Sequence, residues 1–434
     1  MIWNQAAEIM ERTEMTKLQE QRLQAVIQSV YEKVPFYRKN MDEAGVRPES
    51  VRTLTDIEQL PFTTKQDMRN NYPYGLLASP MKEIVRVHAS SGTTGKPTVV
   101  AYTRNDLDVW GEVLARTLAA GGLHSGSVFQ VSVNYGLFTG GLGMHYAAER
   151  IGAAVVPASG GNSSRQVMLM KDFGTTAMVI TPSYALHLAE VMRELGVQPG
   201  DTALESVFCG AEAWSDKMHE EVEDRFGVPA FDVYGLSEII GPGVSCECEA
   251  HQGLHVQEDH FYPEVIDPVT GRVLPEGEEG ELVLTTLTRT GSPMIRYRTR
   301  DLTALERVPC ACGRTQVKMR RVLGRNDDML IIRGVNVFPS QVESVLLAYG
   351  ETSPHYQLIV RRENNLDTLT VVVERHETSA KESLHPEVLI GRLRDRFKSV
   401  LGVNASVRLA EPHSIERSEG KAKRVIDLRQ EAIA

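Results

Sequence analysis

The sequence lacks the features of a membrane-spanning, secreted or disulfide-stabilised protein. None of its apolar stretches approaches the roughly 20 residues that a transmembrane helix needs. The N-terminal segment MIWNQAAEIMERTE carries three glutamates and has no basic region followed by an apolar run, so we expect no signal peptide. Five cysteines are few and odd in number, which argues against a disulfide framework. We therefore expect a cytoplasmic protein.

An excess of positive charge is also absent. The 47 Lys and Arg residues face 57 Asp and Glu residues, for a formal net charge of −10. Proteins that bind nucleic acid or anionic membranes over a large surface usually carry the opposite balance, so we expect neither as a partner. A nucleotide ligand is not excluded, because it needs only a few local positive charges.

The patterning of the chain predicts an α/β protein. At roughly 150 residues per domain, 434 residues predict two or three domains. Apolar residues between positions 18 and 31 recur at helical spacing and could pack on their own domain or on a second subunit, as in a homodimer. From about residue 84, short β-branched runs alternate with helical segments at 106–120 and 183–195, and a strand is expected at 281–287.

A charged, glycine-led junction at 324–328 separates the last hundred residues from the rest. Beyond it, two strand-like runs at 356–361 and 368–374 precede a helix that Gly402 can end. We therefore expect a large domain at 1–325, with 1–75 as a candidate helical subdomain, and a small α+β domain at 326–434.

A loop rich in glycine and hydroxyl residues follows the first predicted strand. It reads Ser90-Ser91-Gly92-Thr93-Thr94-Gly95-Lys96-Pro97-Thr98. Its backbone N–H groups and its lysine suit a polyphosphate, although a surface turn is the alternative. It is not a Walker A loop, because Ser90 replaces the first glycine and Pro97 replaces the hydroxyl residue that would bind magnesium.

Four segments together resemble the adenylate-forming superfamily, and within it the phenylacetate–CoA ligase branch. They are LPFTTKQDMRNNYPYG at 60–75, SSGTTGKPTVVAYT at 90–103, YGLSEIIGPGV at 234–244 and GRNDDMLIIRGVNVFPSQVE at 324–343. The resemblance implies a large adenylate-forming domain with mixed sheets and helices, followed by a small, mobile α+β cap domain. It also implies an AMP-forming ligase that joins an aryl acid, phenylacetate first, to coenzyme A with ATP and Mg²⁺.

The resemblance assigns roles to individual residues. Those implied for ATP binding are Ser90, Ser91, Gly92, Thr93, Thr94, Gly95, Lys96, Lys65, Gly210, Ala211, Glu212, Asp232, Tyr234, Gly235, Ser237, Asp301 and Arg325. Among these, the resemblance implies that Tyr234 stacks on the adenine base and that Asp301 binds the ribose hydroxyls. The implied catalytic residues are Lys96, Glu238, which also binds magnesium, and Lys421. The hinge is assigned to Asp327, and the path of coenzyme A to Arg333 and Gly334.

The acid pocket is expected between the segment after residue 134 and the loop after Glu238. Its candidate walls mix aromatic and small residues, which suit a flat ring but would equally suit a core: Tyr135, Phe138, Ala211, Ile239, Pro242 and Gly243. Indoleacetate and benzoate derivatives stay open as substrates.

Two Cys-x-Cys pairs with histidines nearby suit a tetrahedral zinc site, although incidental free cysteines are the alternative. A resemblance to zinc-bearing members of the same branch, which carry ECxxxxGLH and CxCGR, selects Cys248, His255, Cys310 and Cys312. Cys246 is the alternative ligand. We expect this zinc to be structural, and we expect Cys209 to be a pocket-wall residue.

Two other functions compete with the CoA ligase. One is an adenylating enzyme that uses another acid or another acceptor, such as a carrier-protein thiol or a deazaflavin cofactor. The other is a non-catalytic nucleotide-binding protein. Lys421, Glu238 and Asp301 speak against the second, since a protein without catalysis has no reason to keep all three.

Overall fold

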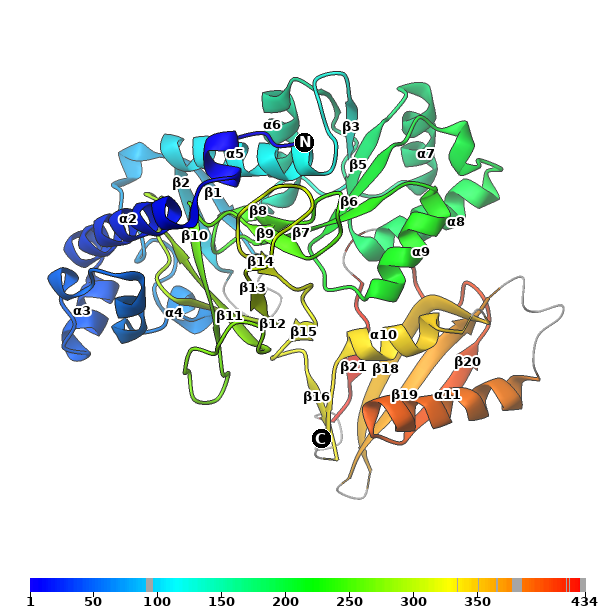
Figure 1. The fold of residues 1–434 in the computed structure, drawn as a ribbon. Helices are drawn as coiled ribbons and strands as arrows, with labels where there is room; N and C mark the ends of the chain where they lie inside the picture. The colour runs from blue at the N-terminus through cyan, green and yellow to red at the C-terminus, as the bar shows by residue number, and fades with distance from the viewer. Residues whose placement is uncertain are drawn as a thin grey trace.

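The computed structural model of the chain (Figure 1) describes residues 1–90, 97–333, 335–349, 351–363, 366–376, 385–418, 420 and 422–429. A large part contains the elements up to β15, and a small part contains those from β16 onward. Over the described residues, no helix is both long and apolar enough to cross a membrane.

The N-terminal helices confirm the helical periodicity of this region. The elements before the first strand are α1 (Gln5–Glu8), α2 (Arg12–Lys33), α3 (Pro35–Glu43), η1 (Pro48–Ser50), η2 (Leu54–Gln59), α4 (Lys65–Asn70) and η3 (Met81–Glu83). The apolar face of α2, including Leu23, Ile27 and Val30, is buried in the core of its own chain. The apolar stripe is thus covered without a second subunit.

A mixed sheet forms the centre of the large part. Among the described residues it has nine strands, in the order β13-β14-β9-β8-β7-β6-β5-β3-β4. The run from β7 to β4 is parallel, and the rest continues it antiparallel. The bounds are β3 (Val128–Val131), β4 (Ala154–Val156), β5 (Ala177–Ile180), β6 (Ser206–Gly210), β7 (Ala230–Leu236), β8 (Gly241–Cys246), β9 (Leu254–Val256), β13 (Leu305–Glu306) and β14 (Lys318–Met319).

Helices connect the parallel strands, as the alternating pattern predicts. The connections are α6 (Gly140–Ile151), α7 (Ser163–Asp172), α8 (Pro182–Glu194) with a short turn η4 (Pro199–Asp201), and α9 (Asp216–Phe226), while α5 (Arg104–Ala120) leads from β2 into β3. Parallel strands need such crossovers, and they leave the carboxyl ends of the strands at one edge, where loops can form a site.

Two further β units complete the large part. The hairpin of β1 (Ile84–Ala89) and β2 (Val99–Thr103) flanks the glycine-rich loop. An antiparallel sheet contains β10 (Phe261–Ile266), β11 (Gly280–Thr286), β12 (Tyr297–Thr303) and β15 (Gly324–Arg325). The strand expected at 281–287 is confirmed as β11, one residue earlier at each end.

The small part is an α+β unit with its own core. Its elements are β16 (Leu330–Ile332), β17 (Val335–Val337), α10 (Pro339–Leu347), β18 (Thr352–Glu363), β19 (Leu366–Arg375), α11 (Pro386–Leu401), β20 (Ala405–Ala410) and β21 (Val425–Asp427). The two predicted strands lie within β18 and β19, and the predicted helix is α11. Gly402 ends α11 with a left-handed φ of 69°.

The small part lies next to α8 and α9 of the large part (Figure 1), with α10 packed against α9. Its apolar core forms a cluster separate from those of the large part. Interfaces between mobile domains are usually smaller and more polar than a core, so this arrangement is typical of two units that can move.

Candidate active site and metal centre

The two described ends of the glycine-rich loop bind each other. The N–H of Ser90 donates to the Thr98 carbonyl at 3.0 Å, and the N–H of Thr98 donates to Ser90 Oγ at 2.9 Å. These bonds extend the β1–β2 hairpin to the start of the loop. The predicted phosphate-binding residues Ser91, Gly92, Thr93, Thr94, Gly95 and Lys96 lie outside the described residues.

Glu238 lies beside this loop, on the turn after β7. Its Oε1 accepts a hydrogen bond from Thr98 Oγ1 at 3.3 Å and lies 3.8 Å from Lys65 Nζ, at the start of α4. Arg289 donates to the Glu238 carbonyl at 2.7 Å, which fixes the backbone of the turn. Only 7% of Glu238 is exposed. Three segments far apart in sequence therefore place a carboxylate and a lysine at the end of the glycine-rich loop.

The turn that carries Glu238 is tightly constrained. A Cβ on Gly235 would lie 2.1 Å from the Gly241 carbonyl, so the β7–β8 turn cannot form with a side chain there. Ser237 Oγ lies 3.0 Å from Thr139 Oγ1, and this contact joins the turn to the segment before α6.

Tyr234, Asp301 and Arg325 form a hydrogen-bonded group. The Tyr234 hydroxyl donates to Asp301 Oδ2 at 2.6 Å, and Arg325 Nη1 donates to Asp301 Oδ1 at 3.3 Å. Asp301 and Arg325 are partners in the β12–β15 ladder. Burial raises the pKa of Asp301, and the charge of Arg325 opposes that shift. A carboxylate has about four acceptor sites, so Asp301 keeps sites for two vicinal hydroxyls.

The segment Gly210-Ala211-Glu212 follows β6 at the carboxyl edge of the sheet. A Cβ on Gly210 would lie 2.4 Å from the Val233 carbonyl of β7, so only glycine fits this close approach. Ala211 is exposed and takes a φ of 73°. Glu212 accepts hydrogen bonds from the N–H of Ser183 at 2.6 Å and of Ala422 at 3.2 Å.

Asp232 belongs to a buried ion-pair cluster. Its Oδ2 lies 3.3 Å from Arg321 Nε, and Arg321 also binds Glu247 at 2.7 Å. Burial and the neighbouring Glu247 raise the pKa of Asp232, and Arg321 opposes the shift. The carboxylate is thus bound to protein groups of the β7–β8 region.

The residues predicted to line the acid pocket lie on two neighbouring segments. Tyr135 and Phe138 precede α6; the Tyr135 hydroxyl lies 3.2 Å from His145 Nδ1, and Phe138 is 47% exposed. Ile239 is buried in the large core, and the Pro242 carbonyl accepts from Trp110 Nε1 at 3.1 Å. A Cβ on Gly243 would lie 2.8 Å from Leu114.

The predicted hinge and CoA residues lie at the junction with the small part. Asp327 is exposed and accepts hydrogen bonds from Arg325 at 2.8 and 2.9 Å. Arg333, in the β16–β17 turn, donates to the Asp367 carbonyl at 3.2 Å with a φ of 52°. Gly334 and Lys421 lie outside the described residues.

Cys248, His255, Cys310 and Cys312 form one cluster. One ligand atom from each lies within 4.8 Å of every other. The Cys248 and Cys310 sulfurs are 3.6 Å apart, and Cys312 Sγ is 3.4 Å from His255 Nε2. Burial alone would raise the pKa of Cys312, but the hydrogen bond with His255 lowers it to about 5. Cys246 is not a member of this group among the described residues; its sulfur lies 4.0 Å from Gln257 Nε2.

Two contributing residues lie outside every segment that the sequence singles out. Arg289 donates to the Glu238 carbonyl, and Glu190 of α8 contacts His355 and Arg417 of the small part. Glu190 is an ordinary polar position of an amphipathic helix. Because the partners of both residues come from distant segments, no local pattern could have identified them.

Sequence comparison finds close relatives over the whole chain. Residues 14–288 match the family AMP-binding enzyme, and residues 334–429 match the AMP-binding enzyme C-terminal domain. Phenylacetate-coenzyme A ligase of Thermus thermophilus is 52% identical over 99% of this chain and 100% of its own length. The Escherichia coli protein of the same name is 50% identical, over 96% and 95%.

Solved structures of 2-hydroxyisobutyryl-CoA ligase share the fold. Its postadenylation state, in complex with R3-HIB-AMP, superposes with a TM-score of 0.93 at 32% identity, covering 99% of this chain and 93% of that one. Its thioesterification state, with 2-HIB-AMP and CoA, gives 0.74 at 33% identity and the same coverage. The likeness confirms the predicted α/β fold with a large N-terminal and a small C-terminal domain, and the arrangement of the two parts is closer to that of the postadenylation state.

Proposed function

This chain belongs to the AMP-binding enzyme family. We propose that it is an AMP-forming ligase that joins phenylacetate to coenzyme A. The observation that carries the proposal is the joining of Glu238 and Lys65 at the end of the glycine-rich loop, with Tyr234, Asp301 and Arg325 grouped nearby. Relatives named phenylacetate-coenzyme A ligase, at 52% and 50% identity over nearly the full length, support the same activity.

The reaction has two steps. An oxygen of the carboxylate attacks the α-phosphorus of ATP, the bond to the β-phosphate breaks, and pyrophosphate leaves. The sulfur of coenzyme A then attacks the acyl carbon, the thiol proton is lost, and AMP leaves with the electron pair of the acyl–oxygen bond. No general base is needed in the first step, because a carboxylate is already ionised at neutral pH.

The main task of the protein in the first step is electrostatic. Two anions must approach each other, so cations and backbone N–H groups must screen the charge that develops. We assign this role to Lys96 and the loop amides, to Lys421, and to Lys65, whose ammonium already lies 3.8 Å from Glu238. Asp301 binds the ribose and Tyr234 stacks on adenine.

The oxygen donors at the end of the loop fit a magnesium ion. Mg²⁺ prefers carboxylate and phosphate oxygens, and Glu238 offers a carboxylate with a threonine hydroxyl 3.3 Å away. We propose that Glu238 holds the ion together with the ATP phosphates. Bound there, it would neutralise phosphate charge during the attack.

The cysteine cluster fits a structural zinc ion. Three thiols and one imidazole within 4.8 Å of one another form the Cys₃His donor set that Zn²⁺ binds tetrahedrally. The cluster joins β9 to the segment after β13, through His255 and the pair Cys310 and Cys312. We assign it a role in holding these two segments together, with no part in the chemistry.

The small domain completes the site in two different ways. We propose that the large domain ends at residue 325 and the small domain begins at 326, with Asp327 as the hinge. Arg333 and Gly334 then lie on the path of coenzyme A. The likeness to the postadenylation state supports an arrangement in which the segment around Lys421 faces the large domain. Rotation about Asp327 would then bring the β16–β17 turn to the site for the second step.

A panel of carboxylic acids tests the proposed function. Pyrophosphate release is measured with phenylacetate, indoleacetate, benzoate and acetate, each with and without CoA, and acyl-CoA is detected by mass spectrometry. We expect the highest kcat/KM with phenylacetate and turnover beyond one equivalent only with CoA. Multiple turnovers without CoA would favour another acceptor, and no pyrophosphate with any acid would contradict the assignment.

A further inference from the structure

Carboxylates accept several of the hydrogen bonds between the two domains, beside an apolar contact of Leu347 in α10 with the large domain. Glu190 of α8 and Glu212 after β6 accept from residues of the small domain, and Glu343 of α10 accepts from Ser215 of the large domain at 3.1 and 2.9 Å. A polar interface can separate and re-form in water, because both sides find water as a partner when apart.

Glu190 is the centre of one of these groups. Its Oε1 lies 2.8 Å from His355 Nε2 on β18, and its Oε2 accepts from Arg417 Nε at 3.2 Å. Glu190 is 8% exposed. Burial alone would raise its pKa, but the hydrogen bonds from His187 and His355 and the charge of Arg417 hold that pKa well below its usual range. The carboxylate is therefore ionised and bridges two segments of the small domain.

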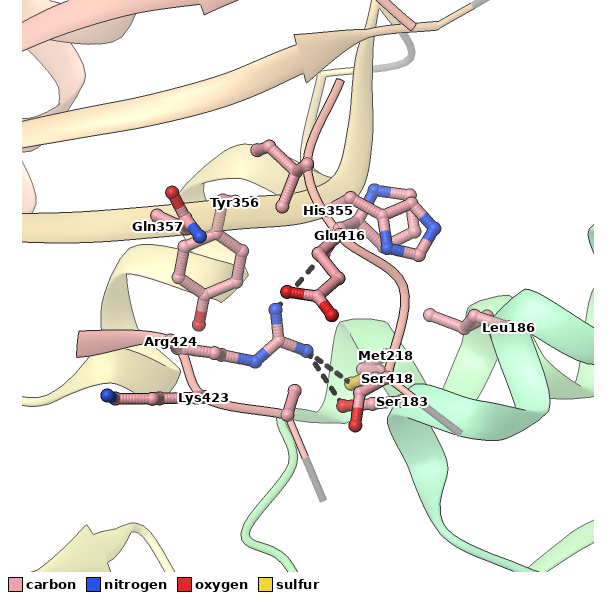
Figure 2. A pocket seen from close by; sticks show the side chains of 13 residues that line it. Ser183, Leu186, Met218, His355, Tyr356, Gln357, Glu416, Ser418, Lys423 and Arg424 are labelled. Atoms are coloured by element: carbon pink, nitrogen blue, oxygen red, sulfur yellow. Dashed lines mark hydrogen bonds between the residues drawn. The ribbon is translucent and has the colours of Figure 1, made fainter. Parts of the chain in front are cut away.

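Arg424 provides a second anchor. It directly precedes β21 and lies three residues beyond Lys421 in sequence. Figure 2 shows its guanidinium between Tyr356 and the helices of the large domain, where it donates to Ser183 Oγ at 3.2 Å. It also pairs with Glu343 at 3.1 Å and lies 4.3 Å from the centre of the Tyr356 ring. Together with Ala422, which donates to Glu212, it ties this segment to α8 and to the loop after β6.

Three of the described residues between 417 and 424 thus contact the large domain. Arg417 binds Glu190, Ala422 binds Glu212, and Arg424 binds Ser183. Lys421, which the family resemblance makes essential for adenylation, belongs to this segment in sequence. Holding a charged group at its productive position is worth orders of magnitude in rate, so the residues that hold its segment affect the chemistry without touching the substrate.

We propose that Glu190 is a positioning residue for adenylation, which binds His355 and Arg417 to hold the Lys421 segment against the large domain in the first step only. The inference rests on the proposed function, because it assumes two half-reactions at one site. The TM-score is 0.93 against the postadenylation state of 2-hydroxyisobutyryl-CoA ligase and 0.74 against its thioesterification state. This difference supports a Glu190 contact that forms in only one arrangement of the two domains.

Substitution of Glu190 leaves Arg417 with a second partner, and the amide oxygen of a glutamine can still accept from His355. Arg417 also forms two hydrogen bonds of 2.8 Å with Glu374, which belongs to the same domain. Glu190→Gln therefore removes the charge and one strong acceptor at the interface but strands no cation in either core. The fold of each domain is expected to survive, while the closed arrangement becomes less populated.

The test measures the two half-reactions separately in the full-length enzyme. Adenylation is followed as pyrophosphate release from ATP and phenylacetate, and thioester formation as the conversion of synthetic phenylacetyl-AMP and CoA. For Glu190→Gln we expect the rate constant for release of the first equivalent of pyrophosphate to fall roughly 5- to 150-fold, the range of a typical coupling between sites, with the half-saturating phenylacetate concentration within about twofold. Thioester formation should stay within about twofold of the parent enzyme.

A control variant removes a glutamate charge from a helix at the N-terminal end of the large domain. Glu14→Gln loses a 2.9 Å contact with Lys17 within α2, and we expect it to change neither half-reaction. His355→Ala removes the donor on β18 and leaves Arg417, so it should give the same selective loss at smaller size, and it tests the proposal even if Glu190→Gln fails to fold.

The outcomes separate the inference from the proposed function. Equal losses in both half-reactions, or no loss in adenylation, would overturn the positioning role of Glu190. If the parent enzyme itself releases no pyrophosphate with phenylacetate, the proposed function fails instead.

Discussion

The two polar clusters of this molecule differ in what they join. The Cys248–His255–Cys310–Cys312 cluster joins segments of one domain, and its ligand atoms lie within 4.8 Å of one another. The cluster around Glu190 joins two domains whose apolar cores are separate, through hydrogen bonds of 2.8 and 3.2 Å. The first is suited to permanent stabilisation, and the second to a contact that forms and breaks in every catalytic cycle.

The proposed active-site residues also fall into two groups, one fixed in the large domain and one carried by the small domain. Asp301, Tyr234 and Glu238 lie on strands and turns of the large domain, so they are present in both half-reactions. The proposed function assigns Lys421, in the C-terminal segment, to the first of them only. Variants of the two halves should therefore differ in which step they impair as well as in how much.

The largest effect is expected for Lys421→Ala. Loss of one group that screens the charge of the transition state costs about 10²- to 10³-fold in kcat, so pyrophosphate release should fall by that factor while synthetic phenylacetyl-AMP is still converted. Lys423→Ala, at an exposed position two residues away, is the matched control and should keep both activities. Normal adenylation by Lys421→Ala would contradict the assigned role.

A smaller effect, but on both steps, is expected for Asp301→Asn. Hydrogen bonds to a charged group contribute about 1.5–3 kcal/mol, which corresponds to a roughly 10- to 100-fold higher KM for ATP. The KM for phenylacetyl-AMP should rise in parallel, because the same ribose is bound. Asp172→Asn, at the exposed end of α7, serves as control. A rise in KM confined to one step would contradict the assignment of Asp301 to ribose binding in both steps.

The zinc assignment predicts an effect on metal content and stability. Elemental analysis by mass spectrometry should find about one zinc ion per chain in the purified protein. The Cys310→Ser variant should contain no zinc, and its Tm should be several degrees lower. Cys246→Ser changes a cysteine outside the cluster and should retain the metal. Retained zinc in Cys310→Ser together with its loss in Cys246→Ser would instead make Cys246 the ligand.

The smallest effect concerns His260, buried in the large domain. Burial lowers its pKa to about 4, from an ordinary value near 6.5. Between pH 6.5 and 5 the unfolded chain binds a proton that the folded chain does not, so the free energy of unfolding falls as pH falls, by at most about 2 kcal/mol. Urea unfolding at both pH values should show this loss, and His260→Gln should reduce it. An unchanged pH dependence in His260→Gln would show that His260 is not the group responsible.

Much of the fold follows from local sequence patterns. The spacing of apolar residues predicts α2, α5, α8 and α11, and the β-branched runs predict the strands of the parallel sheet, because both depend on which face of an element is buried. The two Cys-x-Cys pairs with nearby histidines indicated a metal-ligand grouping, but the choice of Cys248, His255, Cys310 and Cys312 over Cys246 came from the family resemblance; the structure brings these four residues together.

The contacts between distant segments were not predictable in this way. Glu190 and His355 are 165 residues apart, and each fits its own helix or strand as an ordinary polar residue. Asp232 was expected with the adenine-binding segments, yet its carboxylate pairs with Arg321, a partner that only the tertiary structure reveals. Such pairs depend on how elements are arranged in space, and no local pattern records that arrangement.

The most direct test of the central claim is the distance between the two domains during the reaction. Fluorescent labels at two exposed positions, Phe173 directly after α7 and Val388 in α11, introduced as unnatural amino acids, would report it by energy transfer. With ATP and phenylacetate we expect one predominant distance, and with phenylacetyl-AMP and a non-reactive CoA analogue a second, clearly different one. A single distance under both conditions would contradict an enzyme whose small domain serves two steps in two arrangements.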